Sequence, residues 1–159
     1  MTMKELIDEQ CILVDIKASS KKQLIQDMAG CLIESGVMNV SSINLRDILF
    51  SAMERERLGS TGVGFGVALP HACIAGLDRI YGVFARVSPA LDFESVDERP
   101  VDIVVLLVAP DDTSGMHLRA LATASRELRR EDMRERLRLA PTAESLYLAL
   151  VGEPKADAT

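Results

Sequence analysis

The sequence predicts one domain of the layered α/β class, and three patterns predict it. Apolar residues recur at helical spacing in the first third of the chain, two apolar runs rich in β-branched residues follow, and helical spacing returns near the end. Strands mixed with helices in this way favour layers of helix and sheet. A length of 159 residues suits one domain with its own core, which needs no disulfide or metal to fold.

Two helices are predicted before residue 60. Ser20 followed by Gln23 resembles a capping box, and helical spacing continues from there to Gly36. A second helix is expected from about Ser42 until Gly59 breaks the pattern. Its last turns carry a charged group: Glu54, Arg55, Glu56 and Arg57.

A glycine-rich stretch, Gly59–His71, follows the second helix. It shows neither helical nor strand periodicity in its first half. Glycines permit turns that direct successive backbone N–H groups into one concavity, and neighbouring hydroxyls add donors. We therefore predict a phosphate-binding loop built from Ser60, Thr61, Gly62 and Gly64.

The second half of the chain predicts two strands and two helices. Ile80–Val87 and Val101–Val108 are typical of strands, the second buried on both faces. Asp111–Ser114 is expected to cap a helix with His117 in its first turns, and a last helix is expected at 143–151. On the first of these helices we expect three buried residues: Leu118, Leu121 and Ala122.

Composition and charge argue against several classes of partner. The formal charge of −6 opposes nucleic-acid binding, and the arginine-rich segment 126–138 interleaves acids, which favours a solvated helix face over a binding patch. No targeting segment is recognisable, and the longest apolar stretch is too short to span a membrane. We expect a cytoplasmic protein without membrane insertion. In that reducing compartment Cys11, Cys31 and Cys73 are interpreted as ordinary buried thiols.

His71 is the residue best placed for chemistry. Pro70 fixes its own φ and restricts Leu69, so the backbone that presents the imidazole has few alternative shapes. A neutral imidazole can attack phosphorus through one nitrogen while the other donates to a carbonyl, and this step needs no cofactor. Arg55 or Arg57 can supply the cation that the phosphoryl group requires.

Residue type alone leaves other interpretations open. A loop histidine such as His71 is more often a surface residue, and His117 fits an ordinary helix surface. The glycine run differs from a dinucleotide fingerprint. A metal site from His71, Cys73 and His117 lacks a familiar ligand spacing. A hydrolase pair of Cys73 and His117 lacks any sign that the two side chains meet.

The stretch from Glu54 to His71 resembles the signature of phosphotransferase-system IIA domains of the mannitol/fructose type. The resemblance covers about residues 5–150 and continues through the motifs at 90–93, 99–108 and 117–122, which leaves 151–159 as an expected disordered tail. It implies a three-layer α/β/α sandwich with a mixed sheet. It also implies that His71 accepts phosphate on Nε2, that Arg55 steadies the phosphoryl group, and that His117 lines the same pocket.

The resemblance also implies partners. The donor would be HPr, a phosphohistidine carrier, or its nitrogen-system counterpart. The chain is most similar to the nitrogen-regulatory subgroup, whose phosphorylation state controls partner proteins. The alternatives are a sugar-transport IIA that passes phosphate to a IIB domain and a binding module that works unphosphorylated. Ala72-Cys73-Ile74 departs from the family pattern, which commonly has a small and then a basic residue, so the choice of donor is open.

Overall fold

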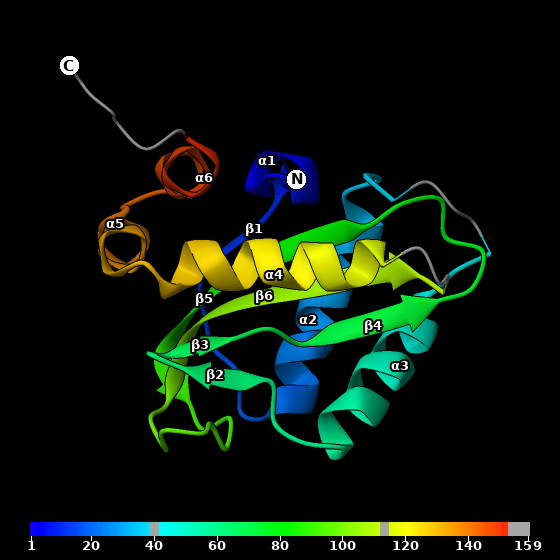
Figure 1. Cartoon of the computed structure of the whole chain (residues 1–159), viewed down its shortest axis with the longest axis horizontal. Helices are drawn as coiled ribbons and strands as arrows, with labels where there is room; N and C mark the ends of the chain where they lie inside the picture. The colour runs from blue at the N-terminus through cyan, green and yellow to red at the C-terminus, as the bar shows by residue number, and fades with distance from the viewer. Residues whose placement is uncertain (39–41, 112–114, 153–159) are drawn as a thin grey trace.

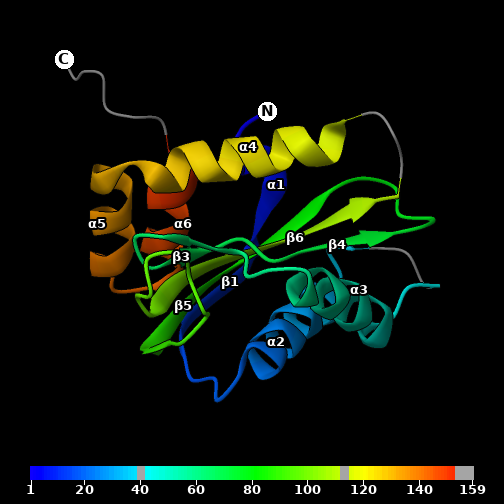
Figure 2. The ribbon, with the colours of Figure 1, turned by 60° about the horizontal axis from the view of Figure 1, so that its bottom comes forward.

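The computed structural model describes residues 1–38, 42–111 and 115–152. A mixed sheet of six strands lies between two layers of helices (Figures 1 and 2). This arrangement confirms the predicted three-layer α/β/α sandwich. The predicted tail at 151–159 begins within the last helix, and its residues from 153 onward lie outside the described part of the chain.

In the described part of the chain, the first strand lies among three helices, five strands then follow one another, and three helices come last. The helices are α1 (Met3–Leu6), α2 (Lys21–Glu34), α3 (Leu45–Arg57), α4 (Met116–Arg129), α5 (Glu131–Leu139) and α6 (Ala143–Val151). The strands are β1 (Ile7–Ile16), β2 (Gly62–Gly64), β3 (Val67–Ala68), β4 (His71–Ile74), β5 (Tyr81–Leu91) and β6 (Val101–Pro110). Figure 2 shows α2 and α3 on one face of the sheet and the other helices on the opposite face.

Strand β6 organises the sheet around the candidate site. The order is β1-β5-β6-β3-β2, and β4 also pairs with β6, parallel to it like β3. The two short strands β3 and β4 thus share one edge of β6, with Leu69 and Pro70 between them. Pro70 has no N–H, but its carbonyl accepts a hydrogen bond of 3.1 Å from the Leu107 N–H. The ladder therefore resumes with His71 as the first residue of β4.

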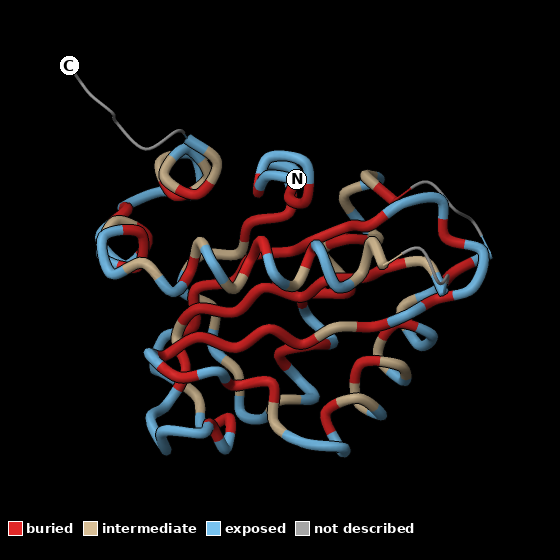
Figure 3. Tube along the Cα trace, in the orientation of Figure 1, coloured by how far each residue is buried: buried red, intermediate tan, exposed pale blue. Residues whose placement is uncertain are grey.

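The core confirms that the strand predicted at 101–108 is buried on both faces. Figure 3 shows the central strands as almost continuously buried. Val104, Leu106 and Val108 pack into the cluster formed with α2 and α3. The alternate residues Val105 and Leu107 pack into the cluster formed with the helices on the opposite face.

The predicted helix starts are partly correct. Ser20 caps α2 by accepting from the Gln23 N–H at 3.1 Å, whereas the Gln23 side chain accepts from Ser19. The start expected near Ser42 is wrong, because Asn44 and Asp47 form a reciprocal cap that begins α3 at Leu45. The last helix has the predicted bounds.

The buried face predicted for the helix that carries His117 is partly correct, because Leu121 is half buried and packs against the core. The cap of this helix was expected at 111–114. The N-cap of α4 is Gly115, which makes no side-chain cap bond, and residues 112–114 lie outside the described part of the chain. Ala120, Ala124 and Leu128 form its buried stripe. Because a step of two residues turns a helix by about 200°, Leu118 and Ala122 face away from that stripe.

The glycine-rich stretch is a hairpin, which the sequence interpretation missed. Strands β2 and β3 are joined by Phe65 and Gly66, which both have positive φ, at 62° and 77°. The guanidinium of Arg138 donates to the Phe65 carbonyl and pairs with Asp102, which fixes the turn against the sheet. Arg134 of the same arginine-rich segment is buried, so that segment is only partly the solvated face that was expected.

Candidate functional site

The imidazole of His71 is held in one orientation by its own strand. Its Nδ1 lies 3.0 Å from the Leu69 carbonyl oxygen. A carbonyl can only accept, so Nδ1 carries the proton and the lone pair of the neutral ring is on Nε2. The side chain is partly buried. His71 thus presents a bare ring nitrogen from a fixed backbone.

The surroundings of His71 keep the ring neutral. Burial lowers its pKa from the ordinary value of about 6.5, and the positive charge of Arg55 lowers it further. The hydrogen bond to Leu69 and the charge of Glu56 act in the opposite direction, but the pKa remains lowered. At neutral pH the ring is therefore ready to act as a nucleophile.

His117 enters the site from the first turn of α4. Its ring lies 4.9 Å from that of His71, centroid to centroid, with an angle of 60° between the ring planes. Burial lowers the pKa of His117, and the charge of His71 lowers it further. The structure thus brings together two histidines that are far apart in sequence.

Cys73 also reaches His117, which spacing alone did not indicate. The Sγ atom of Cys73 lies 3.8 Å from Nδ1 of His117, and the cysteine is exposed, so the prediction that it is buried is wrong. Because side chains alternate along β4, Cys73 and His71 lie on the same side of that strand. Cys73 is therefore part of the site surface.

The structure distinguishes the two candidate arginines. Arg55, in the last turn of α3, donates to the Gly59 carbonyl at 2.9 Å and is near enough to influence the pKa of His71. Within the described residues Arg55 forms no ion pair. Arg57 instead pairs with Glu54 at 2.7 Å, and its side chain is 74% exposed. Arg55 is thus the candidate arginine whose charge acts on the imidazole.

The predicted phosphate-binding loop uses its donors within the protein. The Ser60 hydroxyl donates to the Phe93 carbonyl and accepts from the Gly62 N–H. Both the N–H and the hydroxyl of Thr61 donate to Glu56, at 3.0 and 2.7 Å. Gly64 lies in the hairpin, paired with Val67. The single anion cradle predicted from the glycines is therefore not present in this arrangement, because neighbouring acceptors compete for the same donors.

Glu56 is a positioning residue that the sequence analysis did not identify. Its buried carboxylate accepts from Lys21 at 3.0 Å as well as from Thr61, and Lys21 also pairs with Glu94. These contacts tie the end of α3 to α2 and to the turn that precedes the hairpin. They fix the helical turn that carries Arg55. One glutamate within a run of four charged residues gives no sequence signal for this role.

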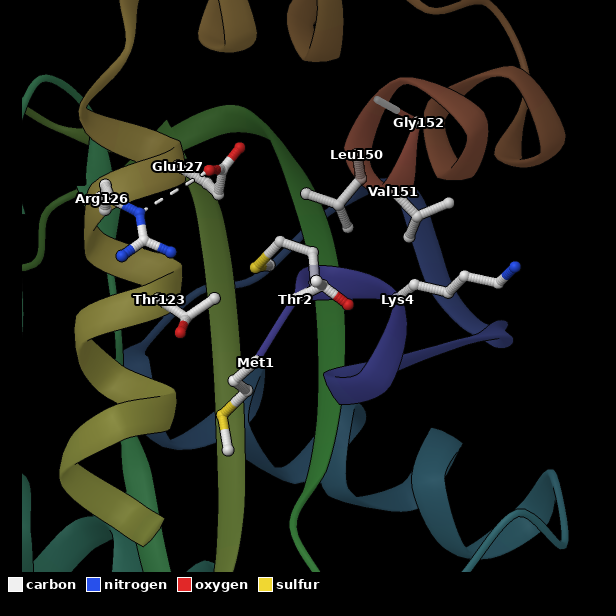
Figure 4. A pocket seen from close by; sticks show the side chains of 10 residues that line it. Met1, Thr2, Lys4, Thr123, Arg126, Glu127, Leu150, Val151 and Gly152 are labelled. Atoms are coloured by element: carbon white, nitrogen blue, oxygen red, sulfur yellow. Dashed lines mark ion pairs between the residues drawn. The ribbon is translucent and has the colours of Figure 1, made fainter. Parts of the chain in front are cut away.

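A groove lies next to the site, and a separate cavity lies beside α4, the helix that carries His117. A groove of about 720 Å³ runs between α3 and β4, lined among others by Phe50, Glu54 and Cys73. A cavity of about 270 Å³ lies between α1, α4 and α6 and contains none of the site residues (Figure 4). Arg126 in its wall pairs with Glu127.

The described residues provide neither a metal-binding cluster nor a membrane-spanning helix. No group of three or more His, Cys, Asp or Glu side chains there is arranged to hold a metal ion. Within the same residues, no helix combines the length and the apolar character needed to cross a membrane.

Known proteins are similar to the chain over most of its length. A "Nitrogen regulatory protein" of Bradyrhizobium diazoefficiens is 39% identical, with 97% of each chain covered. One of Pseudomonas aeruginosa is 33% identical, with 87% of this chain and 88% of the relative covered. The "PTS system fructose-specific EIIABC component" of Bacillus subtilis is 32% identical over 86% of this chain, which matches 21% of that longer protein.

Solved structures agree with these similarities. The crystal structure of the nitrogen regulatory protein IIA-Ntr from Neisseria meningitidis has a TM-score of 0.83 and 30% identity, with 93% of this chain and 98% of that chain covered. Residues 5–151 match the family model described as "Phosphoenolpyruvate-dependent sugar phosphotransferase system, EIIA 2". The chain belongs to this family of phosphoryl-carrier domains.

Proposed function

We propose that the protein accepts a phosphoryl group on Nε2 of His71 from an HPr-like phosphohistidine carrier. The observation that carries this proposal is the contact of Nδ1 with the Leu69 carbonyl, which leaves Nε2 unprotonated and fixed in direction. The half-buried ring is neutral at the pH of the cytoplasm, where we expect the protein to act.

The transfer needs positioning and charge more than proton movement. The Nε2 lone pair of His71 forms a bond to phosphorus while the donor's N–P bond breaks, and that electron pair returns to the donor imidazole. The phosphoryl group brings roughly two negative charges. One cation at ~4 Å contributes on the order of 4 kcal/mol at an effective dielectric of ~20, and Arg55 is placed to supply it.

His117 and Arg55 make the acceptor more than a surface histidine. The ring of His117 lies 4.9 Å from that of His71, centroid to centroid, and the charge of Arg55 disfavours protonation of His71. The groove between α3 and β4 adds an exposed aromatic surface, with Phe50 at 67% exposure. A protein donor requires such a surface more than a small molecule does.

The role we infer is regulatory. The alignments with relatives named nitrogen regulatory proteins cover most of this chain and most of each relative. This similarity supports control of partner proteins through the phosphorylation state. The similarity to the fructose-specific component supports a second function, the transfer of phosphate to a IIB domain. A binding module that acts without phosphate is the remaining alternative.

Phosphorylation can be tested directly. We would incubate the protein with phosphoenolpyruvate, Enzyme I and HPr or its nitrogen-system counterpart. We expect an acid-labile gain of one phosphate, which is lost in His71→Ala and kept in Arg57→Ala, the matched control on the exposed side of α3. Persistence of the phosphate in His71→Ala would eliminate the assignment.

A second experiment separates the three roles. Addition of a fructose-type IIB domain to the phosphorylated protein should leave the phosphate on His71 if the role is regulatory, whereas rapid loss indicates transport. Pull-downs with the wild type and with His71→Asp should yield different partner sets. Identical sets and affinities would favour the binding module.

A further inference from the structure

A pair of thiols lies outside the phosphoryl site, at the contact between β1 and α2. Cys11 is fully buried in β1, and Cys31 is half buried in α2. Both side chains pack into the same core cluster, and the Cys31 sulfur lies 3.6 Å from the carbonyl oxygen of Gln10, the residue before Cys11. From the sequence, both residues were expected to be ordinary buried thiols that only fill the core.

The hydrogen bonds around the pair assign different states to the two thiols. The Ser35 hydroxyl donates to the Leu32 carbonyl at 2.9 Å, so its lone pairs face the Val37 N–H and, at 3.7 Å, the sulfur of Cys11. Cys31 donates to the Gln10 carbonyl at 3.6 Å. Once Cys31 loses that proton, its sulfur can accept from the Cys11 thiol.

This arrangement favours a thiolate at Cys31. The hydrogen bond with Cys11 lowers the pKa of Cys31 to about 7, although burial and the charge of Glu34 oppose it. The hydrogen bond with Cys31 raises the pKa of Cys11, and burial and the charge of Asp8 raise it further. The pair therefore consists of a nucleophilic sulfur beside a protonated one.

Only Cys31 is accessible from outside. An open groove of about 370 Å³ lies over it, with Asp27 and Glu34 in its wall. Two carboxylates repel anions, so the groove favours a small neutral oxidant. Cys11, which is fully buried, is placed to react with its neighbour and not with solvent.

We propose that Cys31 and Cys11 form a peroxide-reactive site that closes to a disulfide between α2 and β1. The Cys31 thiolate attacks one oxygen of hydrogen peroxide, the O–O bond breaks, and the departing hydroxide takes a proton to give water, leaving a sulfenic acid. The Cys11 sulfur then attacks the Cys31 sulfur, the S–O bond breaks, and a second water leaves. Two thiols are oxidised and one peroxide is reduced.

The test treats the full chain with equimolar hydrogen peroxide at neutral pH. We expect a mass loss of two hydrogen atoms, a linked pair of peptides that contain Cys11 and Cys31, and a higher Tm that dithiothreitol reverses. Cys73→Ser is the matched control and should behave as the wild type. Cys11→Ser should stop at a sulfenic acid on Cys31 that a dione reagent traps.

Two results would overturn the proposal. The first is treated protein in which Cys11 and Cys31 stay reduced while Cys73 is oxidised. The second is a pH profile for alkylation of Cys31 by iodoacetamide in the wild type with its midpoint at an ordinary thiol value of about 8.5 or above. This second measurement needs no variant and therefore does not depend on the folding of Cys11→Ser.

Discussion

Nδ1 of His71 and the carbonyl oxygen of Leu69 lie 3.0 Å apart, on either side of Pro70. Because Pro70 fixes its own φ and restricts Leu69, this contact is set by the chain itself and not by a distant partner. The contact defines the tautomer of the ring and the direction of its lone pair.

The first prediction concerns the protonation of His71. Because burial and Arg55 lower its pKa, the ring should titrate below about 6.5, and the rate of phosphoryl acceptance should rise with pH through that lowered pKa and then level off. Long-range ¹H–¹⁵N NMR should show a proton on Nδ1 and none on Nε2. A titration midpoint above 6.5, or the opposite tautomer, would contradict the proposed nucleophile.

The same lowered pKa affects folding in a defined direction. The folded state binds the His71 proton less well than the unfolded state does. The contribution of this group to stability is therefore fully present above the unfolded pKa and is lost as pH falls through the folded pKa. In His71→Asn the free energy of unfolding should depend less on pH in the range below about 6.5, as measured by urea denaturation.

The second prediction concerns Arg55. In Arg55→Gln the pKa of His71 should rise, since one of its lowering influences is removed, and phosphoryl transfer should slow by at least about tenfold, which corresponds to about 1.4 kcal/mol. Arg57→Gln is the matched control, because Arg57 lies two residues further along α3 and pairs with Glu54. Equal transfer rates in both variants would remove Arg55 from the mechanism.

The third prediction concerns Glu56. In Glu56→Gln one buried carboxylate oxygen becomes an NH2 group that cannot accept. The single remaining oxygen cannot replace both Oε2, which accepts from Lys21 and the Thr61 N–H, and Oε1, which accepts from the Thr61 hydroxyl, so we expect a loss of about 1–3 kcal/mol in the free energy of unfolding. The pKa of His71 should also fall, because the Glu56 charge raises it. Chemical denaturation and NMR titration test the two effects. Glu54→Gln, at the exposed ion pair with Arg57, is the control and should change neither.

The fourth prediction concerns Arg86, a buried residue of β5 far from the chemistry. Its guanidinium forms two hydrogen bonds with Asp15 and donates to the carbonyls of Leu137 and Ala140 at 2.8 and 2.7 Å. Arg86→Met leaves these carbonyls without their donor and should cost on the order of 3 kcal/mol.

Asp15→Asn is the control for Arg86. The Asp15 side chain is largely exposed, so this substitution should cost clearly less in a urea denaturation. If Arg86→Met is as stable as the wild type, the guanidinium does not hold the end of α5 against the sheet.

The parts of the fold that the sequence predicted are those with strong local signals. The last helix was predicted with its correct bounds, and the structure shows that Thr142 caps its start. The start of α3 was not, because Asn44 competes with Ser42 and forms the reciprocal cap with Asp47. The hairpin at 62–68 was missed because it requires Phe65 at positive φ, which that residue rarely adopts.

His71, Arg55 and His117 were named from the sequence, whereas Glu56 was not, and the geometry of the site could not be predicted. The sequence analysis expected one ring nitrogen of His71 to donate to a carbonyl. The structure identifies this carbonyl as that of Leu69. The approach of Cys73 to His117 depends on how α4 crosses the end of β4, which no local pattern encodes. The hydrogen bond that the Thr61 N–H donates to Glu56 likewise depends on the tertiary structure, so no local pattern predicts it.

The break at Leu69 and Pro70 also has a consequence for solubility. It divides the chain that pairs with one side of β6 into the short strands β3 and β4. The edge strands on this side of the sheet are therefore β2 and β4, with three and four residues. Long unpaired margins are the templates on which separate molecules join into aggregates, and short ones are poor templates. The interruption that aims the imidazole thus also discourages self-association of the sheet.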